Sequence, residues 1–281
     1  MARSVFLLLL SSIVAAASVQ AQEYESTRAS FKTHLVRPGP SPQSYERAKP
    51  PRRVSEVEYQ SGALKLKAWL ALPTEKHEPF SAIIFLHGGF SFSLDDYKQA
   101  QPFLDAGYAV MFPFLRGENG NPGNFELMYG EVDDALAAAR WLRKHRGIDP
   151  ARVSIFGHSV GGAIAELTSL SREGPLLLSG SVGALYPPQI FQSWKGLAPF
   201  DTTQPKEVVL RVFVMNLSSM RRRHVAYLGN EEPQVEFVKG YREQAAKHSA
   251  PLSISIVPGD HESAVAPAMK AFLVELQSLS R

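Results

Sequence analysis

Cysteine is absent from this chain of 281 residues. Its absence excludes disulfide bonds, a thiol nucleophile and zinc sites built on cysteine, so the hydrophobic core alone must stabilise the fold. A large excess of charge is also lacking, because 30 basic residues face 27 acidic ones and the net charge is +3. Without a basic stripe interleaved with aromatic residues, we expect no nucleic-acid partner. Metal-ligand sets, phosphate-cradling loops and cofactor motifs are lacking as well, so we expect no metal and no cofactor.

An apolar run near the N-terminus has the features of a signal peptide. A basic start precedes the run, which extends from Val5 to about Ala17, and a small-residue cleavage site ends at Ala21. The run is shorter than the roughly 20 residues that a membrane span needs. A buried first strand or helix is the alternative. We expect removal of residues 1–21 and export to the periplasm or the extracellular space, with no membrane span in the mature chain.

The remaining sequence divides into a polar segment and a regular one. Residues 22–53 are rich in Pro, Arg and Ser without a sustained period, which indicates a leader or an irregular arm lying on the domain. Over residues 54–281, short continuous apolar runs alternate with segments of helical spacing, so we expect one domain. This alternation predicts an α/β fold with a mainly parallel twisted sheet and helices on both faces. Residues 187–222 fit less well, and we expect an insertion that caps the active face.

The expected elements follow from these periods. Strands are expected at 63–73, 81–89, 106–117, 152–159, 176–187, 224–232 and 252–261, and helices at 130–145, 160–171, 235–249 and 264–279.

The stretch IFGHSVGGA, residues 155–163, contains the pattern G-x-S-x-G of a nucleophile elbow. At such an elbow a serine occupies a sharp strand-to-helix turn with strained backbone angles, so the residues two positions away must be small. Gly157 and Gly161 meet that demand, and Gly162 lets the helix pack closely on the sheet. A small residue in a tight turn is the alternative. The strand before the motif and the helix after it favour Ser159 as a nucleophile.

A base and an acid should follow the nucleophile along the chain, with the acid first. His261 lies in a glycine-containing loop after the last buried strand and before the closing helix, so we expect it to be the base. His224 and His248 stand at the start of a strand and the end of a helix, where structural roles are common. His158 should point away from the serine beside it.

The acid is expected in the loop after the strand that begins at residue 224. This loop offers Glu231 and Glu232 ahead of Pro233, and the residues alone leave both open. Asp260 is the direct neighbour of His261 and could hardly fold back onto that imidazole. We therefore expect Asp260 to stabilise its own loop.

An acyl-transfer nucleophile also needs hydrogen-bond donors for the oxyanion. The stretch FLHGGF, residues 85–90, predicts a glycine turn whose backbone N–H groups face the site. We expect Gly89 to give one donor and Val160 the other, because the residue after the nucleophile stands at a helix N-terminus. Phe90 is the alternative to Gly89.

Aromatic residues in the loops at the strand ends are candidates for a substrate pocket. Phe90 follows the glycine turn, and Tyr129, Tyr186 and Trp194 are within range. Core packing is the alternative for each of them alone. Together they predict an apolar pocket for an acyl group or a side chain.

The segments FLHGGF, GEVDDALAAARWL, GHSVGG, GNEEP and GDH together resemble the α/β-hydrolase fold. More narrowly, they are similar to the catalytic domain of the prolyl oligopeptidase family (peptidase family S9) and to dienelactone-hydrolase-like serine hydrolases. The resemblance covers about residues 60–281. In the acid loop of this family, written roughly G-x-x-D-P, alignment on Gly229 and Pro233 puts Glu232 where the aspartate stands.

The resemblance implies that Ser159 attacks an acyl carbon, that His261 acts as general base and then general acid, and that Glu232 orients His261. Two departures bear on the substrate. Prolyl oligopeptidases carry a large β-propeller, which we do not expect in the residues ahead of this domain, and dienelactone hydrolases use a cysteine nucleophile, which this sequence lacks. We therefore expect an exported serine hydrolase whose partner is a small ester or a short peptide. The alternatives are a carboxylesterase of small esters and a non-catalytic binding protein with a degenerate acid loop.

Overall fold

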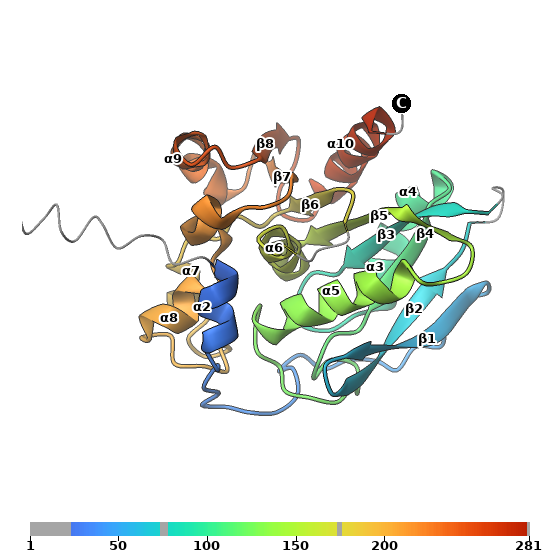
Figure 1. The fold of residues 1–281 in the computed structure, drawn as a ribbon, viewed down its shortest axis with the longest axis horizontal. Helices are drawn as coiled ribbons and strands as arrows, with labels where there is room; N and C mark the ends of the chain where they lie inside the picture. The colour runs from blue at the N-terminus through green and yellow to red at the C-terminus, as the bar shows by residue number, and fades with distance from the viewer. Residues whose placement is uncertain (1–23, 74–77, 173–175, 280–281) are drawn as a thin grey trace, which may run out of the picture.

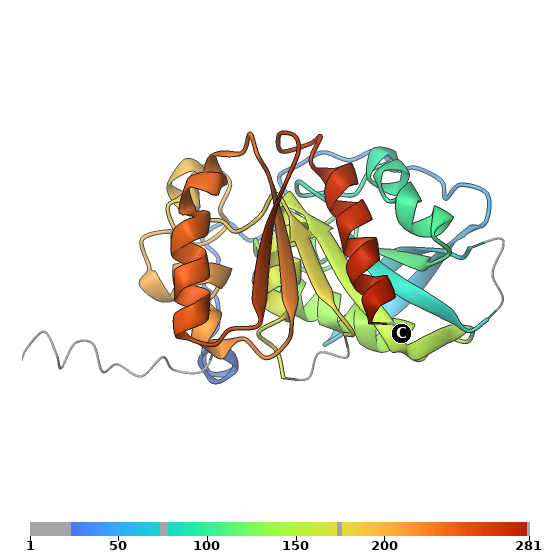
Figure 2. The same cartoon turned by 90° about the horizontal axis from the view of Figure 1, so that it is seen from above.

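The computed structural model describes residues 24–73, 78–172 and 176–279, which form a sheet flanked by helices (Figures 1 and 2). The strands are β1 (Val54–Ser61), β2 (Leu64–Ala71), β3 (Phe80–Leu86), β4 (Ala109–Pro113), β5 (Ile148–His158), β6 (Ser179–Val182), β7 (His224–Gly229) and β8 (Leu252–Val257). The helices are α2 (Tyr24–Ser30), α3 (Leu94–Gln99), α4 (Gln101–Asp105), α5 (Gly130–Leu142), α6 (Ser159–Thr168), α7 (Ile190–Ser193), α8 (Pro205–Val209), α9 (Val238–Lys247) and α10 (Val265–Ser278), with 3₁₀ helices η1 (Phe213–Ser219) and η2 (Pro233–Phe237).

The described strands form one sheet in the order β1-β2-β4-β3-β5-β6-β7-β8. The pairs β1–β2 and β2–β4 are antiparallel, and all the others are parallel. The predicted mainly parallel sheet is therefore confirmed. In parallel sheets of this kind ligands bind outside the carboxyl ends of the strands, and β3, β5, β6, β7 and β8 all end at one such edge.

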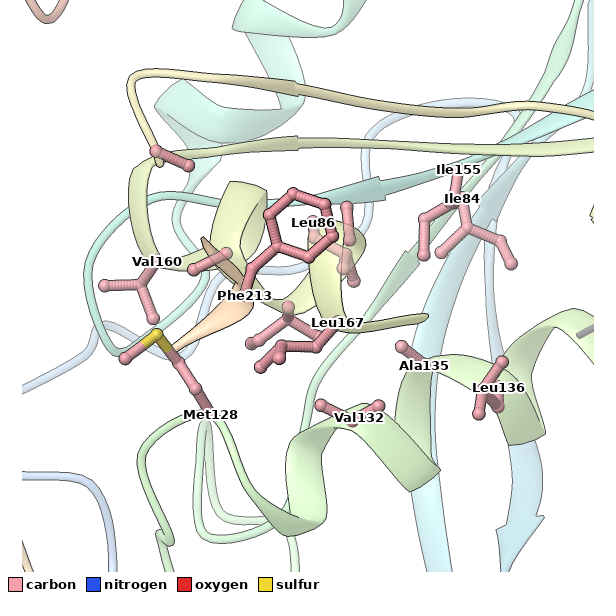
Figure 3. Packing of buried hydrophobic residues seen from close by; sticks show 14 of the residues in the cluster. Ile84, Leu86, Met128, Val132, Ala135, Leu136, Ile155, Val160, Leu167 and Phe213 are labelled. Atoms are coloured by element: carbon pink, nitrogen blue, oxygen red, sulfur yellow. The ribbon is translucent and has the colours of Figure 1, made fainter. Parts of the chain in front are cut away.

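Two hydrophobic clusters fill the layers on the two faces of the sheet. Helices α5, α6 and α9 cover one face, where Ile84 and Ile155 pack with Ala135 (Figure 3). Helices α4 and α10 cover the other, where the rings of Phe156 and Phe272 lie 5.0 Å apart. Because successive strand residues face opposite layers, strands buried on both sides carry the continuous apolar runs seen in the sequence.

Several elements differ from those expected. Strand β1 was not predicted, because it is an edge strand with many exposed polar residues. Helices α2, α3 and α4 have five to seven residues each, too few for a periodic signal. The apolar run 176–187 predicts a long strand, yet only residues 179–182 pair in the sheet. Its last residues instead form a buried loop at the carboxyl edge, so the run reflects burial and not strand length.

Residues 24–53 lie on the domain as an arm and include α2. The hydroxyl of Tyr24 donates to the carbonyl of Leu210 at 3.2 Å, and Arg28 holds the carboxylate of Asp133 at 2.6 and 2.9 Å. The expected insertion 187–222 contains α7, α8 and η1 and connects β6 to β7. The predicted signal peptide lies outside the described residues. Among the helices described, none is long and apolar enough to cross a membrane.

Candidate active site

Ser159 occupies the turn between β5 and α6 with a backbone φ of +54°, a value that residues other than glycine rarely adopt. The flanking glycines allow this turn. A Cβ on Gly157 would lie 2.1 Å from the carbonyl oxygen of Gly161, and a Cβ on Gly161 would lie 2.4 Å from the carbonyl oxygen of His87. Both distances are far inside van der Waals contact. The G-x-S-x-G pattern is thus required by the close approach of α6 to β5 and β3.

Three side chains from separate loops form a hydrogen-bonded row at the carboxyl edge. The Nε2 atom of His261 lies 3.0 Å from Ser159 Oγ, and its Nδ1 atom lies 3.2 Å from Glu232 Oε2. The second carboxylate oxygen of Glu232 accepts the N–H of Gly229 at 2.9 Å, which fixes the carboxylate at the end of β7. The sequence order of serine, acid and histidine is the order of an α/β hydrolase.

The two candidate acids have different surroundings. The side chain of Glu232 is 1% exposed and faces His261, whereas Glu231 is exposed. The structure therefore brings Glu232, and not Glu231, to the imidazole. Asp260 accepts hydrogen bonds from Ser263 and from the backbone N–H of residue 262, all within its own loop, which matches the loop-stabilising role expected for it.

The hydrogen bond with Glu232 raises the pKa of His261 above its ordinary value, and partial burial only reduces this effect. His158, on the other side, is buried, and its Nε2–H donates to the carbonyl of His261 at 3.0 Å. Burial and the nearby charge of His261 lower the pKa of His158. His158 thus holds the loop that carries His261 through this hydrogen bond.

Ligand atoms of His158, His261 and Glu262 lie within 4.8 Å of one another, the spacing of a possible metal site. Both ring nitrogens of His261 and Nε2 of His158 already have hydrogen-bond partners among the described residues. Binding an ion through His261 would displace either Ser159 or Glu232 from its imidazole, so we assign no metal to this cluster.

The glycine turn after β3 lies directly against the serine. A Cβ on Gly88 would be 3.5 Å from the Cβ of Ser159, and Gly89 has a φ of +68°. At the start of the turn, His87 Nε2 lies 3.1 Å from Glu118 Oε2. Burial disfavours the imidazolium, but the carboxylate outweighs this effect and raises the pKa of His87 to about 9. Val160, the other predicted donor residue, is in the first turn of α6, where backbone N–H groups have no partner within the helix.

Of the four predicted pocket residues, Tyr186 contacts the serine, and Trp194 and Phe90 follow Tyr186 in a chain of ring contacts. The Tyr186 hydroxyl lies 2.9 Å from Ser159 Oγ, the rings of Tyr186 and Trp194 are 5.2 Å apart, and those of Trp194 and Phe90 are 6.1 Å apart. These rings form an aromatic wall that meets Ser159 at Tyr186. Trp194 comes from the insertion 187–222.

Tyr129 lies apart from this wall. Its hydroxyl donates to the carbonyl of Phe31 at 2.8 Å, and the guanidinium groups of Arg28 and Arg211 are each 4.8 Å from its ring centroid. These contacts hold Tyr129 in the packing between the arm and the insertion, and none of them joins it to Ser159. This position does not support the expected role of Tyr129 in the pocket. A place in a strand-end loop does not specify which way the ring of that residue turns.

Sequence reasoning missed one contact at the site. The side-chain oxygen of Gln43, in the arm, accepts the backbone N–H of Phe90 at 2.8 Å. The arm carries no period or motif, and its partner is 47 residues away, so no local pattern could have indicated this pairing.

A mainly parallel sheet covered on both faces, with a serine elbow after a central strand, defines the α/β-hydrolase class of fold. A model of the alpha/beta hydrolase family matches residues 83–276, and this protein belongs to that family. An uncharacterized peptidase of Bacillus subtilis, YtmA, is 32% identical over 123 residues, which are 43% of this chain and 48% of that protein. The chain therefore aligns with about half the length of this curated relative.

Two solved structures share the fold. An acylaminoacyl peptidase from Pyrococcus horikoshii has a TM-score of 0.63 at 17% identity, over 81% of this chain and 41% of that chain. An esterase from Pyrococcus furiosus also has a TM-score of 0.63, at 15% identity, over 88% of this chain and 98% of that chain. At such identities the likeness concerns the fold alone, and it confirms the predicted α/β-hydrolase fold.

Proposed function

We propose that this protein is a serine hydrolase that cleaves ester or short peptide bonds through an acyl-enzyme on Ser159. The observation that carries the proposal is the continuous row from Ser159 Oγ through His261 to Glu232, with contacts of 3.0 and 3.2 Å. A serine, a base and an acid in this arrangement activate a hydroxyl for acyl transfer. The alternative, a non-catalytic binding protein, was based on a degenerate acid loop. The contact between Glu232 and His261 favours an enzyme instead.

In the proposed reaction, His261 Nε2 takes the proton of Ser159 as Oγ bonds to the substrate's carbonyl carbon. Glu232 keeps the imidazole in the tautomer that accepts at Nε2, and it stabilises the imidazolium that forms. The N–H groups of Val160 and Gly89 stabilise the oxyanion. His261 then gives its proton to the leaving group. A water molecule, deprotonated by His261, releases the acyl group and restores Ser159.

The hydroxyl of Tyr186 has a role in this scheme. When Ser159 donates its proton to His261, the contact between Ser159 and Tyr186 needs a donor, and Tyr186 supplies it. Burial raises the pKa of Tyr186, so the hydroxyl keeps its proton. On the other side of the loop, Glu166 accepts the N–H of Leu185 at 2.9 Å and fixes the backbone beside Tyr186. The hydroxyl thus remains a donor beside the reacting centre, where the substrate's carbonyl oxygen takes up the negative charge.

Tyr186→Phe should lower kcat by about tenfold or more, because it removes one donor from the reacting centre and leaves the ring packing intact. Steady-state kinetics with an aryl ester would measure the effect. Tyr227→Phe is the matched control, since the buried hydroxyl of Tyr227 has no partner among the described residues. Equal rates for the two variants would exclude a role for the Tyr186 hydroxyl.

The substrate class can be tested with p-nitrophenyl acetate and alanine p-nitroanilide, a small ester and an aminoacyl amide. We expect the purified protein to hydrolyse the ester in a reaction that requires Ser159. Turnover of the anilide as well would assign a peptidase, and turnover of the ester alone would assign a carboxylesterase. The proposed function would be contradicted if the folded protein hydrolysed neither substrate and also failed to hydrolyse longer acyl and dipeptidyl analogues.

We also propose that the protein is exported. The basic start, the apolar run from Val5 to about Ala17 and the cleavage site at Ala21 support this proposal. N-terminal sequencing of protein recovered from the secreted or periplasmic fraction should give a mature chain that begins near Gln22.

A further inference from the structure

Both backbone polar groups of Phe90 are bound by residues of the arm. The N–H of Phe90 donates to the side-chain oxygen of Gln43 at 2.8 Å, and its carbonyl accepts the hydroxyl of Ser41. Phe90 directly follows the turn His87-Gly88-Gly89 that abuts the nucleophile. Two hydrogen bonds from the arm therefore hold the end of the turn that is predicted to bind the oxyanion.

The arm segment 39–44 is itself hydrogen-bonded to the loop after β4, which contains residues 117–125. The N–H of Ser41 donates to the carbonyl of Gly117 at 2.9 Å, and the N–H of Phe125 donates to the carbonyl of Gly39 at 2.9 Å. Ser91 also donates to the carbonyl of Ser44, at 3.3 Å. The arm is thus fastened on both sides of its contact with Phe90, and it can transmit a fixed position to that residue.

The turn needs such a support. Two successive glycines have more backbone freedom than any other pair of residues, and neither has a side chain that packing could hold. At its start the turn is anchored by His87 and Glu118, 3.1 Å apart. At its end the anchor is Gln43, whose oxygen would be 2.7 Å from a Cβ on Gly89. A residue other than glycine at position 89 would strain the backbone at its φ of +68° and would displace the Gln43 side chain.

The ring of Phe90 extends the same support to the aromatic wall. It packs against Trp194 at 6.1 Å, Trp194 packs against Tyr186 at 5.2 Å, and the Tyr186 hydroxyl is 2.9 Å from Ser159 Oγ. Movement of Phe90 would therefore disturb both the turn and the wall that face the serine.

We propose that Gln43 is a positioning residue of the active site. By accepting the N–H of Phe90, it holds the Gly88-Gly89 turn in the orientation that presents the N–H of Gly89 to the oxyanion. The inference rests on the proposed hydrolase function. It makes the N-terminal arm, which has no catalytic group of its own, a working part of the oxyanion site.

The test compares Gln43→Met with the wild type in the full mature chain. Methionine keeps the length of the side chain and removes the acceptor. We expect kcat for p-nitrophenyl acetate to fall by about tenfold, because small misplacement of a catalytic donor is costly, while KM changes less than about twofold. Ser41→Ala removes the hydroxyl that donates to the carbonyl of Phe90, and it should lower kcat in the same way. Gln277→Ala, on the exposed side of α10, is the control and should leave both constants unchanged.

Amide hydrogen exchange supplies a readout that does not depend on turnover. Exchange in the peptide covering residues 87–92 should be faster in Gln43→Met, with the melting temperature unchanged. Unchanged kcat and exchange in both variants would overturn the inference while leaving the hydrolase intact. A rise in kcat would also overturn it, because the arm would then obstruct the site. If the folded wild type shows no Ser159-dependent turnover, the proposed function fails and this inference fails with it.

Discussion

Replacing Ser159 with alanine should lower kcat on the order of 10⁶-fold, the effect of removing the nucleophile from a serine hydrolase. The substitution removes one oxygen atom from the row formed with His261 and Tyr186. Alanine meets the same backbone strain as serine at a φ of +54°, so the free energy of unfolding should change little. Turnover of an aryl ester and thermal unfolding, measured on the same preparation, check both expectations.

Ser253→Ala is the matched control, because Ser253 is exposed on β8 and takes no part in the site. Its kinetic constants should equal those of the wild type. Hydrolysis by a folded Ser159→Ala protein at a rate near that of Ser253→Ala would show that another group performs the chemistry.

Glu232→Gln should lower kcat/KM by about 10³- to 10⁴-fold. A glutamine can turn its NH₂ group toward His261 Nδ1, which favours the tautomer that cannot accept a proton at Nε2. Glu231→Gln is the matched control one residue away and should lower kcat/KM by less than about twofold. The side chain of Glu231 is exposed, and of the two glutamates it is Glu232 that contacts the imidazole. The opposite ranking of the two variants would assign the acid role to Glu231.

The pH profile gives an independent check on the same pair. His261 must be neutral to act as base, so kcat/KM should rise with pH through the pKa of its imidazole. Because Glu232 raises that pKa, the inflection in the wild type should lie above the ordinary histidine value of 6.5. Loss of the carboxylate should move the inflection to lower pH in the residual activity of Glu232→Gln. An inflection that stays in place would separate Glu232 from the ionisation of His261.

The parts of the site that local steric rules govern could be predicted from the sequence. The elbow at Ser159 needs glycines at fixed offsets, and the buried strands on either side are readable as apolar runs. His261 could be placed because it stands between the last such strand and the closing helix. The choice between Glu231 and Glu232 was left open by the residues, since both lie in one short loop and only the backbone path decides which carboxylate turns inward.

The parts that depend on contacts between distant segments could not be predicted. Gln43 reaches Phe90 across 47 residues of sequence, and the polar arm that carries it has no period. Tyr129 lies in the loop between β4 and α5, but its hydroxyl donates to the arm carbonyl of Phe31. Tyr186 was expected only as part of an apolar pocket. Its hydroxyl contact with Ser159 arises because the run 176–187, which contains it, leaves the sheet early and forms a loop.

The central claim is that Ser159 is an activated nucleophile, and labelling of the purified mature protein with a fluorophosphonate tests it most directly. The reagent reacts by preference with a serine oxygen that a neighbouring base deprotonates, and the bond that it forms is stable. The account predicts stoichiometric labelling of the wild type, mapped to Ser159, and none of Ser159→Ala. A folded wild type that stays unlabelled, or a Ser159→Ala protein that labels equally, would contradict it.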